Sequence, residues 1–280
     1  MSMDRREFIT ASAIGSLTLG HSVITPGDLL VDSRPSDTPA QARTGDAAGT
    51  AGTRKILIAG GGFNTAYIRY MAALSGKKRP RICYLPTASA DAEDGIIRFY
   101  ESCAPLDVEP HVQRSFIESL TQHQGWDDVF LSMDGIVVSG GNTLNQQAIW
   151  KAQGIDAVLR QAWDKGVVLG GASAGSLCWF EEGTTDSRPK ALSIVKCMGF
   201  LKGSHSPHYD AEAGRRPLYH KLIGDGTMKP GYACDNDAGI YFEDNTVARV
   251  VSARPGAKVY YVSVVNGAVV EKVHEPEMIA

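Results

Sequence analysis

Short apolar runs and helical patterns alternate along the middle of the chain. Runs bounded by glycine, proline or polar residues predict buried strands at Lys55–Ala59, Arg81–Pro86, Glu109–Val112, Asp134–Ser139 and Gly166–Gly170. Apolar positions at helical spacing predict helices at Asn64–Leu74, Asp91–Cys103, Leu144–Ala152 and Ile155–Asp164. This alternation predicts an α/β fold, with a doubly wound, mostly parallel sheet that carries helices on both faces.

The pattern changes in the last third of the chain. A polar stretch, Glu181–Lys190, predicts a loop, and Arg215–Ile223 predicts a helix. Period-two alternation with turn signals at Asp244-Asn245 and Asn266-Gly267 then predicts C-terminal antiparallel strands. These expected strands are Gly239–Phe242, Val247–Ser252, Lys258–Val264 and Ala268–Val273. We expect this meander to extend one edge of the sheet.

The N-terminal residues differ in composition from the rest. Arg5 and Arg6 precede a weakly apolar run that ends at Val23, which resembles a twin-arginine export signal over residues 1–24. That run is too short and too polar for a membrane span, so we expect none in the mature protein. Residues 25–53 lack periodicity and are rich in Pro, Ala, Gly, Asp and Thr, which predicts a linker before a folded domain at 54–280. The expected location is therefore periplasmic or extracellular, and the export machinery is an expected partner.

Composition narrows the function classes. The chain is 43% hydrophobic and 21% charged with a net charge of −3, which gives no indication of nucleic acid as a partner. The five cysteines are dispersed, which argues against a disulfide framework and a zinc site. Gly60-Gly61-Gly62 follows the first expected strand, but Thr65 stands where G-x-G-x-x-G requires its third glycine. We therefore expect neither a dinucleotide nor any other cofactor.

The fifth expected strand leads into a serine motif. Gly171-Ala172-Ser173-Ala174-Gly175 fits G-x-S-x-G, the nucleophile elbow, in which a sharp strand-to-helix turn exposes the serine hydroxyl. Small flanking residues suit such a turn because larger side chains would not fit beside it. Strand, motif and helical pattern occur in the required order, so Ser173 is our candidate nucleophile.

A serine nucleophile needs a base, an orienting group and donors for the oxyanion. Among the seven histidines, His208 lies on a proline-stiffened loop beyond an expected strand end, with His205 as its nearest rival. Asp186 is our candidate for orienting the imidazole, and Glu181 and Glu182 stay open as alternatives. The amides of Ala174 and Gly141 are candidate oxyanion donors, since both follow expected strand ends.

Together these motifs resemble a known family. Gly140-Gly141-Asn142-Thr143, the Ser173 motif, Thr184-Thr185-Asp186 and Ser206-Pro207-His208-Tyr209 occur in the order seen in serine peptidases similar to dipeptidase E and cyanophycinase. The resemblance implies a fold like that of class I glutamine amidotransferases. It also implies a Ser173–His208–Asp186 triad, an acyl-enzyme and a short peptide substrate. Four residues would lie at the substrate: Asn142, His205, Arg215 and Arg216.

Substrate preference stays open at this point. The family's aspartyl dipeptidases hold an acidic N-terminal residue with a cation shortly after the histidine, about where Arg215 and Arg216 stand. The segment before them, residues 210–214, is shorter and acidic here. Three alternatives remain: a cyanophycinase-like exopeptidase, an α/β-hydrolase-type esterase with His274 as base, and an exported binding protein without catalysis. The sequence does not predict the oligomeric state.

Overall fold

The computed structural model describes residues 52–117 and 121–280. The expected export signal, and all of the expected linker except its last two residues, lie outside these ranges. No helix in the described part of the chain is long and apolar enough to cross a membrane.

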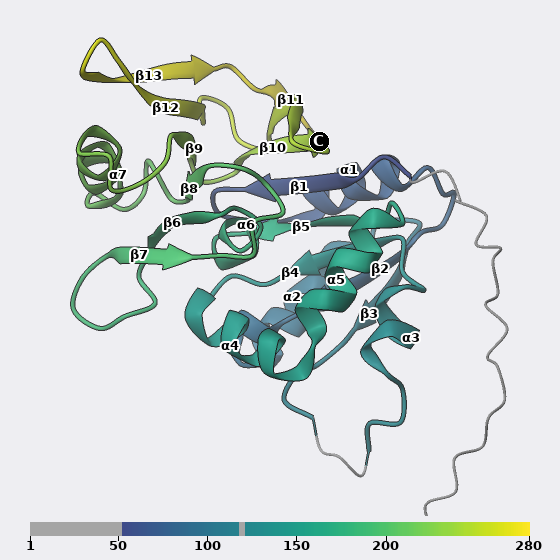
Figure 1. The fold of residues 1–280 in the computed structure, drawn as a ribbon. Helices are drawn as coiled ribbons and strands as arrows, with labels where there is room; N and C mark the ends of the chain where they lie inside the picture. Colours follow the sequence, from purple (N-terminus) through teal and green to yellow (C-terminus); the bar gives the residue numbers. More distant parts are fainter. Residues whose placement is uncertain (1–51, 118–120) are drawn as a thin grey trace, which may run out of the picture. The chain divides into compact units, whose positions relative to one another are not determined.

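The central sheet has eight strands in the order β14-β11-β10-β1-β5-β4-β2-β3 (Figure 1). From β1 to β3 in that order all neighbours are parallel, whereas β10 is antiparallel to β1 and to β11. The strands are β1 (Lys55–Ala59), β2 (Arg81–Leu85), β3 (Glu109–Val112), β4 (Gly135–Val138), β5 (Val168–Ala172), β10 (Ala238–Glu243), β11 (Thr246–Ser252) and β14 (Glu277–Met278). The predicted α/β fold with a mostly parallel sheet is confirmed.

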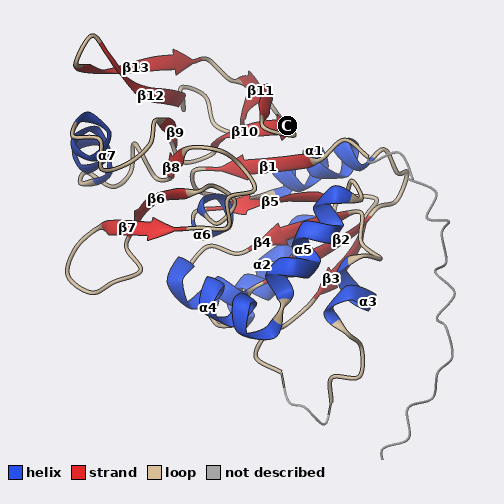
Figure 2. Cartoon of the chain, in the orientation of Figure 1, coloured by secondary structure: helices blue, strands red, loops and turns tan. Residues whose placement is uncertain are grey.

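Helices cover both faces of this sheet, as Figure 2 shows. Alternating residues of β1 separate two cores: Ile56 and Ile58 pack with Trp150 and Trp163, whereas Leu57 packs with Tyr67 and Phe99. Consequently α1 and α2 lie on one face and α4 and α5 on the other. The helices are α1 (Thr65–Ser75), α2 (Glu93–Cys103), α3 (Trp126–Phe130), α4 (Thr143–Gln153), α5 (Ile155–Asp164), α6 (Ala174–Leu177), α7 (Arg215–Gly224) and a 3₁₀ turn, η1 (Thr87–Ser89).

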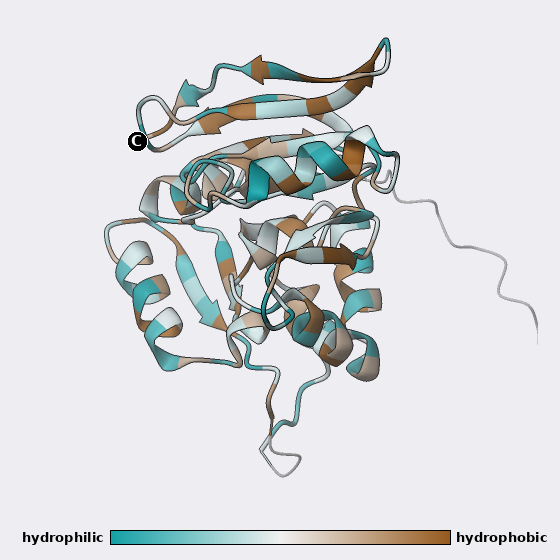
Figure 3. Cartoon of the chain, turned by 90° about the vertical axis from the view of Figure 1, so that its left-hand side faces the viewer, coloured by the Kyte–Doolittle hydropathy of each residue, from teal (hydrophilic) through white to brown (hydrophobic). Residues whose placement is uncertain are grey.

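A second sheet of six strands, in the order β13-β12-β9-β8-β6-β7, is a feature that the sequence patterns did not predict. Its strands are β6 (Glu182–Thr185), β7 (Ser193–Lys196), β8 (Ser204–Ser206), β9 (Gly231–Cys234), β12 (Val259–Val265) and β13 (Ala268–His274). The outer hairpin β12–β13 carries both hydrophobic and hydrophilic residues (Figure 3). The expected meander is therefore split: β10 and β11 extend the central sheet, but β12 and β13 join the second.

The expected loop at Glu181–Lys190 is wrong, because β6 occupies its first half. The side chain of Glu182 is 2% exposed, pairs with Lys196 and accepts a hydrogen bond from the amide of Lys229 at 2.8 Å. Thr184 Oγ1 likewise lies 2.8 Å from Ser206 Oγ. Partners on neighbouring elements satisfy these polar groups, so a polar segment is buried as a strand.

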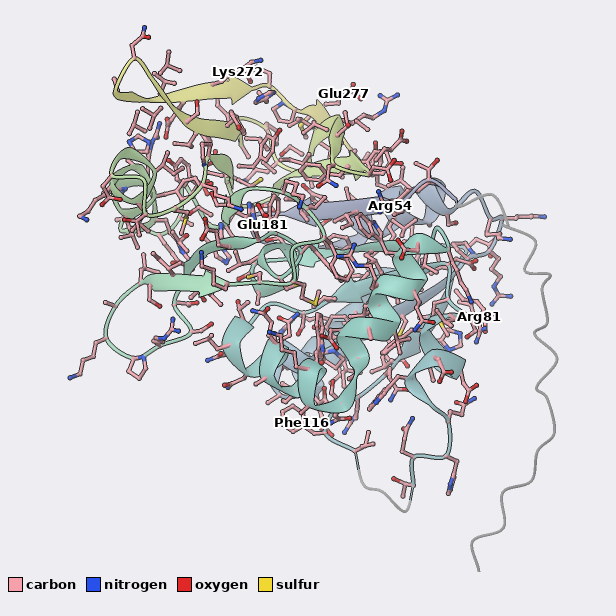
Figure 4. All side chains as sticks on the ribbon, in the orientation of Figure 1. Arg54, Arg81, Phe116, Glu181, Lys272 and Glu277 are labelled. Atoms are coloured by element: carbon pink, nitrogen blue, oxygen red, sulfur yellow. The ribbon has the colours of Figure 1, made fainter. Side chains whose placement is uncertain are left out.

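Figure 4 shows how side chains fill the space between these layers. Arg54, at the start of β1, pairs with Asp244 at 2.6 Å and with Asp164 at 3.7 Å. Glu181 accepts from the amide of Gly203 and pairs with Lys229, so it ties the start of β6 to the segments beside β8 and β9. Glu181 and Glu182 therefore have structural partners of their own.

Candidate active site

Ser173 lies at a sharp turn between β5 and α6. Its φ of 57° and ψ of −118° are unusual for a residue with a side chain, and such strain is often retained at functional sites. The amide of Ser173 donates to the carbonyl oxygen of Ala59, at the carboxyl end of β1, at 3.3 Å. α6 has a single turn, shorter than the sequence predicted.

The glycines on either side of Ser173 permit this turn. A Cβ atom at Gly171, which has φ of 146°, would overlap the carbonyl oxygen of Val138. A Cβ atom at Gly175 would meet the same oxygen. The turn therefore packs directly on the backbone at the end of β4, which only glycine permits at these two positions.

His208 approaches the same end of β1 from the second sheet. It follows β8 and Pro207, has a φ of 54°, and donates its amide to the carbonyl oxygen of Gly60 at 3.3 Å. Ser173 and His208 thus bond to consecutive carbonyl groups, those of Ala59 and Gly60. Among the described residues, no hydrogen bond joins Ser173 Oγ directly to the His208 ring.

The imidazole of His208 is oriented by Asn236. His208 Nδ1 lies 2.7 Å from Asn236 Oδ1. A carboxamide oxygen only accepts hydrogen bonds, so Nδ1 carries the proton and the lone pair lies on Nε2. The ring is therefore held in the tautomer that a general base requires.

Asn236 is itself fixed by charged neighbours. Its amide donates to Asp210 Oδ1 at 2.8 Å, and its carbonyl oxygen accepts from Arg254 Nη2 at 2.8 Å. Arg254 also pairs with Asp210 and, at 3.2 Å, with Asp237. This network fixes the backbone on which the Asn236 side chain stands.

The contacts favour Asn236 over Asp186 as the orienting group. The Asp186 side chain is 66% exposed, and its Oδ1 lies 3.7 Å from Arg215 Nη2. The expected orienting group was an acidic residue between Ser173 and His208 in the sequence, whereas Asn236 is neutral and follows His208. Its position in the sequence could have indicated this role, because Asn236 follows the carboxyl end of β9. Ligands of α/β proteins bind near the carboxyl ends of the strands.

The four expected substrate-binding residues make internal contacts instead. The Arg215 side chain is 2% exposed and donates to Glu212 Oε2 and the Thr184 carbonyl oxygen, each at 2.7 Å. Arg216 pairs with Glu271, with its guanidinium 5.1 Å from the Tyr260 ring centroid. Two further residues complete the set: Asn142 caps α4 and donates to the Ser187 carbonyl oxygen, and His205 is fully buried.

His205 is a neutral core residue. Its Nε2 lies 3.0 Å from Ser176 Oγ, its Nδ1 lies 2.9 Å from the Tyr232 carbonyl oxygen, and its ring stacks on Phe180. Burial, as the largest cause, lowers the pKa of His205 to about 3. His205 thus supports the packing beneath the turn and takes no proton in the neutral range.

Replacing His205 by Gln should make stability less sensitive to acid. The folded protein leaves His205 neutral down to a pKa of about 3, whereas the unfolded chain protonates it below about 6.5. Unfolding therefore takes up a proton in this window, and the free energy of unfolding falls as the pH falls through it. Urea unfolding between pH 6 and 4.5 should show a slope that is lower in the variant by on the order of 1 kcal/mol per pH unit. The exposed histidine variant His123→Gln is the control; equal slopes in wild type and His205→Gln would contradict the burial argument.

The two candidate oxyanion donors follow the ends of β4 and β5, with Gly141 next to Gly140 and Ala174 directly after Ser173. A Cβ atom at Gly140 would stand 3.3 Å from Ser173 Cβ, so the turn after β4 packs against the serine. Gly141 has φ of 131°, and a Cβ atom there would overlap the carbonyl oxygen of Ala88. The amide of Ala174 is the first of α6 and so has no partner within that helix.

A pocket of about 350 Å³ opens beside Ser173 on the α1–α2 face of the sheet. Its floor is the apolar ends of β4 and β5, and α2 forms one wall. The residues that line it are Gly62, Phe63, Asn64, Tyr84, Gly95, Arg98, Phe99, Ser102, Val137, Val138, Ser139, Gly140, Ala172 and Ser173. Gly62 lines this pocket, while a Cβ atom at its neighbour Gly61 would stand 2.8 Å from His208 Nδ1.

Known proteins resemble this chain in sequence and in fold. The model of peptidase family S51 matches residues 56–250. The uncharacterized peptidase YgaJ of Bacillus subtilis is 43% identical over an alignment of 224 residues that covers 77% of this chain and 94% of YgaJ. Two crystal structures share the fold. A peptidase from an acI-B1 Actinobacterium has a TM-score of 0.61 at 15% identity, over 81% of this chain and 96% of that one. A putative peptidase E from Listeria monocytogenes has a TM-score of 0.53 at 16% identity, over 70% and 96%.

Proposed function

Because the chain belongs to peptidase family S51 and is a serine peptidase, we propose that it hydrolyses short peptides with Ser173 as nucleophile and His208 as general base. One observation carries this proposal. The amides of the two residues donate to the consecutive carbonyl groups of Ala59, which ends β1, and Gly60, which follows it. Because Asn236 bonds to Nδ1 of His208, Nε2 is the ring nitrogen left to accept the serine proton. The serine stands on a strained turn beside a pocket, which is where a substrate carbonyl can reach it.

In the first step Ser173 Oγ attacks the carbonyl carbon of the scissile peptide bond, and its proton passes to Nε2 of His208. The carbonyl oxygen becomes an oxyanion, which the amides of Ala174 and Gly141 can bind. The C–N bond then breaks as the imidazolium returns its proton to the leaving amine. This leaves an ester between Ser173 and the acyl part of the peptide.

A water molecule completes the cycle. His208 removes one proton from the water, and the hydroxide attacks the ester carbon. The C–O bond to Ser173 breaks, and Oγ takes the proton back from the imidazolium. The products are a carboxylic acid and an amine, and the enzyme returns to its starting state.

Asn236 gives this triad a neutral third member. The carboxamide oxygen orients the ring and fixes its tautomer, as an aspartate would, but adds no negative charge beside the imidazolium. Asp210 and Asp237 do not supply this missing negative charge directly, since both pair with Arg254. We therefore assign Asn236 a positioning role.

We also propose that the protein is exported by the twin-arginine route. The proposal rests on Arg5, Arg6 and the apolar run up to Val23. Fusing residues 1–53 to a reporter should direct it to the periplasm, and substituting both arginines by lysine should retain it in the cytoplasm. Unchanged export of the lysine variant would contradict this proposal.

A peptide panel tests the proposed reaction. The purified protein is incubated with peptides of two to six residues, including Asp-X dipeptides and an Asp-Arg isopeptide, and products are identified by mass spectrometry. We expect cleavage of the shortest peptides at one bond. Turnover of the isopeptide alone would favour the cyanophycinase-like reading, and hydrolysis of esters without any peptide would favour an esterase.

A further inference from the structure

The pocket beside Ser173 is built for a bulky apolar group. Its floor includes Val137 and Ala172, each at most 7% exposed, whose side chains belong to the core on the α1–α2 face. The rings of Tyr84 and Phe99 stack at 5.1 Å between centroids with an interplanar angle of 12°, and Phe63 also lines the pocket. An apolar floor with aromatic walls is the usual lining of a site that takes an apolar ligand group.

Gly95 keeps this pocket open. It is the third residue of α2 and has no positive φ, so the backbone at this position does not demand glycine. A helical glycine costs roughly 1 kcal/mol relative to alanine. A Cβ atom here would stand 3.0 Å from Tyr84 Oη, so any side chain would press into the pocket wall. The lack of space beside the pocket therefore explains why a glycine stands at this helical position.

Ser139 is a buried polar residue in the pocket wall. It is 3% exposed, and its hydroxyl interacts with the hydroxyl of Tyr84, where the contact opposes the rise in the Tyr84 pKa that burial causes. Because buried polar atoms in folded proteins nearly always have partners, this contact accounts for both hydroxyls. The apolar floor and the aromatic rings are therefore the features of the pocket that would select a substrate.

The charge of the pocket does not select an acidic group. Arg98 is the one charged residue in the lining, and its Nη2 lies 2.7 Å from Asp94 Oδ2, one helical turn earlier on α2. Both side chains are about two-thirds exposed, at 68% and 65%. The cation is thus neutralised and solvated, which weakens any pull on a substrate carboxylate.

We propose that this pocket binds a large apolar or aromatic side chain of the residue next to the scissile bond, and so sets the substrate preference. The inference rests on the proposed function, because it assigns the substrate class of the same serine. Ser173 lines the same pocket, so a substrate side chain bound there brings the neighbouring carbonyl group to the serine. Phe, Tyr, Leu and Met are the residues that match this lining.

Two kinds of measurement test the assignment. Rates are measured with X-Ala and Ala-X dipeptides, where X is Phe, Leu, Ala or Asp, so that both sides of the scissile bond are tested. Binding of the same dipeptides is measured by calorimetry with Ser173→Ala, which separates affinity from chemistry. We expect Phe or Leu to exceed both Ala and Asp in kcat/KM by at least about tenfold, which one large apolar contact readily provides.

Filling the pocket should remove that preference. Gly95→Val should lower kcat/KM for the Phe peptide at least about 100-fold and for Ala-Ala less than about threefold. Ser102→Leu, on the same wall of α2, is a second filling variant in case Gly95→Val does not fold. Ile97→Ser is the matched control on the outer face of α2, where Ile97 is 57% exposed, and it should keep the wild-type preference.

The outcomes separate this inference from the proposed function. The pocket assignment is overturned if hydrolysis depends on Ser173 but prefers Asp, or if neither filling variant alters it. Either result leaves the peptidase mechanism standing. Binding of Phe peptides to Ser173→Ala that Gly95→Val abolishes, with no hydrolysis by the wild type, supports the pocket and overturns the mechanism. Neither binding nor hydrolysis of any dipeptide overturns both.

Discussion

Ser173→Ala is expected to lower kcat/KM for the best peptide of the panel by at least about 10⁴-fold. In the proposed reaction, Ser173 Oγ forms the bond to the substrate carbon, so the alanine variant lacks the nucleophile itself. The hydroxyl makes no hydrogen bond to the residues that the structure describes, and the Ser173 amide that bonds to Ala59 is retained in the variant. The loss should therefore appear in steady-state kinetics without a matching loss of thermal stability.

Two comparisons make this result specific. Ser173→Gly adopts the φ of 57° without strain, and it should be as inactive as the alanine variant. Ser132→Ala removes a hydroxyl that bonds only to the Val129 carbonyl oxygen, and it should retain wild-type turnover. If Ser173→Ala kept more than about a tenth of the activity, an acyl-enzyme on this residue would be excluded.

The parallel part of the fold was predictable because short segments of the sequence indicate each of its strands and helices. Buried strands such as Ile136–Val138 are apolar on both faces, and glycines mark their ends, so single segments show both type and boundary. The turn at Ser173 was also local, since strand, small residues and serine follow one another within a few positions. Such patterns need no knowledge of what lies across the sheet.

The second sheet was not predictable in the same way. β6 contains Glu182 and Thr184, whose polarity indicates a loop until their partners are known. Those partners, Lys196 and Ser206, lie on β7 and β8 and are brought close only by folding. The sequence of residues 181–190 alone does not indicate that neighbouring strands will supply hydrogen-bond and ion-pair partners for these polar side chains.

Tertiary contacts also bear on the expected functional residues. Arg215 and Arg216 had the charge and position for substrate binding, but the folded chain supplies Glu212 and Glu271 as their partners. Asp186 had the right chemistry to orient a histidine, yet Asn236 reaches His208 from the turn between β9 and β10. Residue type indicates what a group can do, whereas tertiary contacts decide whether it is free to do it.

The second large effect is expected at His208. His208→Asn should lower kcat/KM by at least about 10³-fold, because general base catalysis typically contributes 10²–10⁴ and the proton of Ser173 would have no acceptor. Asparagine is chosen because it tolerates the φ of 54° better than most residues, so the loss reports on the ring. Steady-state rates with the best dipeptide measure the effect.

His274→Asn is the matched control that decides between peptidase and esterase chemistry. His274 ends β13, pairs with Val259 in the outer hairpin, and its ring centroid lies 6.5 Å from that of Tyr232. The amide of His208, by contrast, donates to the carbonyl oxygen of Gly60. Gly60 is the neighbour of Ala59, which accepts from the Ser173 amide. The His274 variant should therefore keep activity within about threefold of wild type, since its contacts lie outside the proposed reaction. Loss of activity in His274→Asn with retention in His208→Asn would reverse the assignment, and would place the base of an α/β-hydrolase-type mechanism on the hairpin.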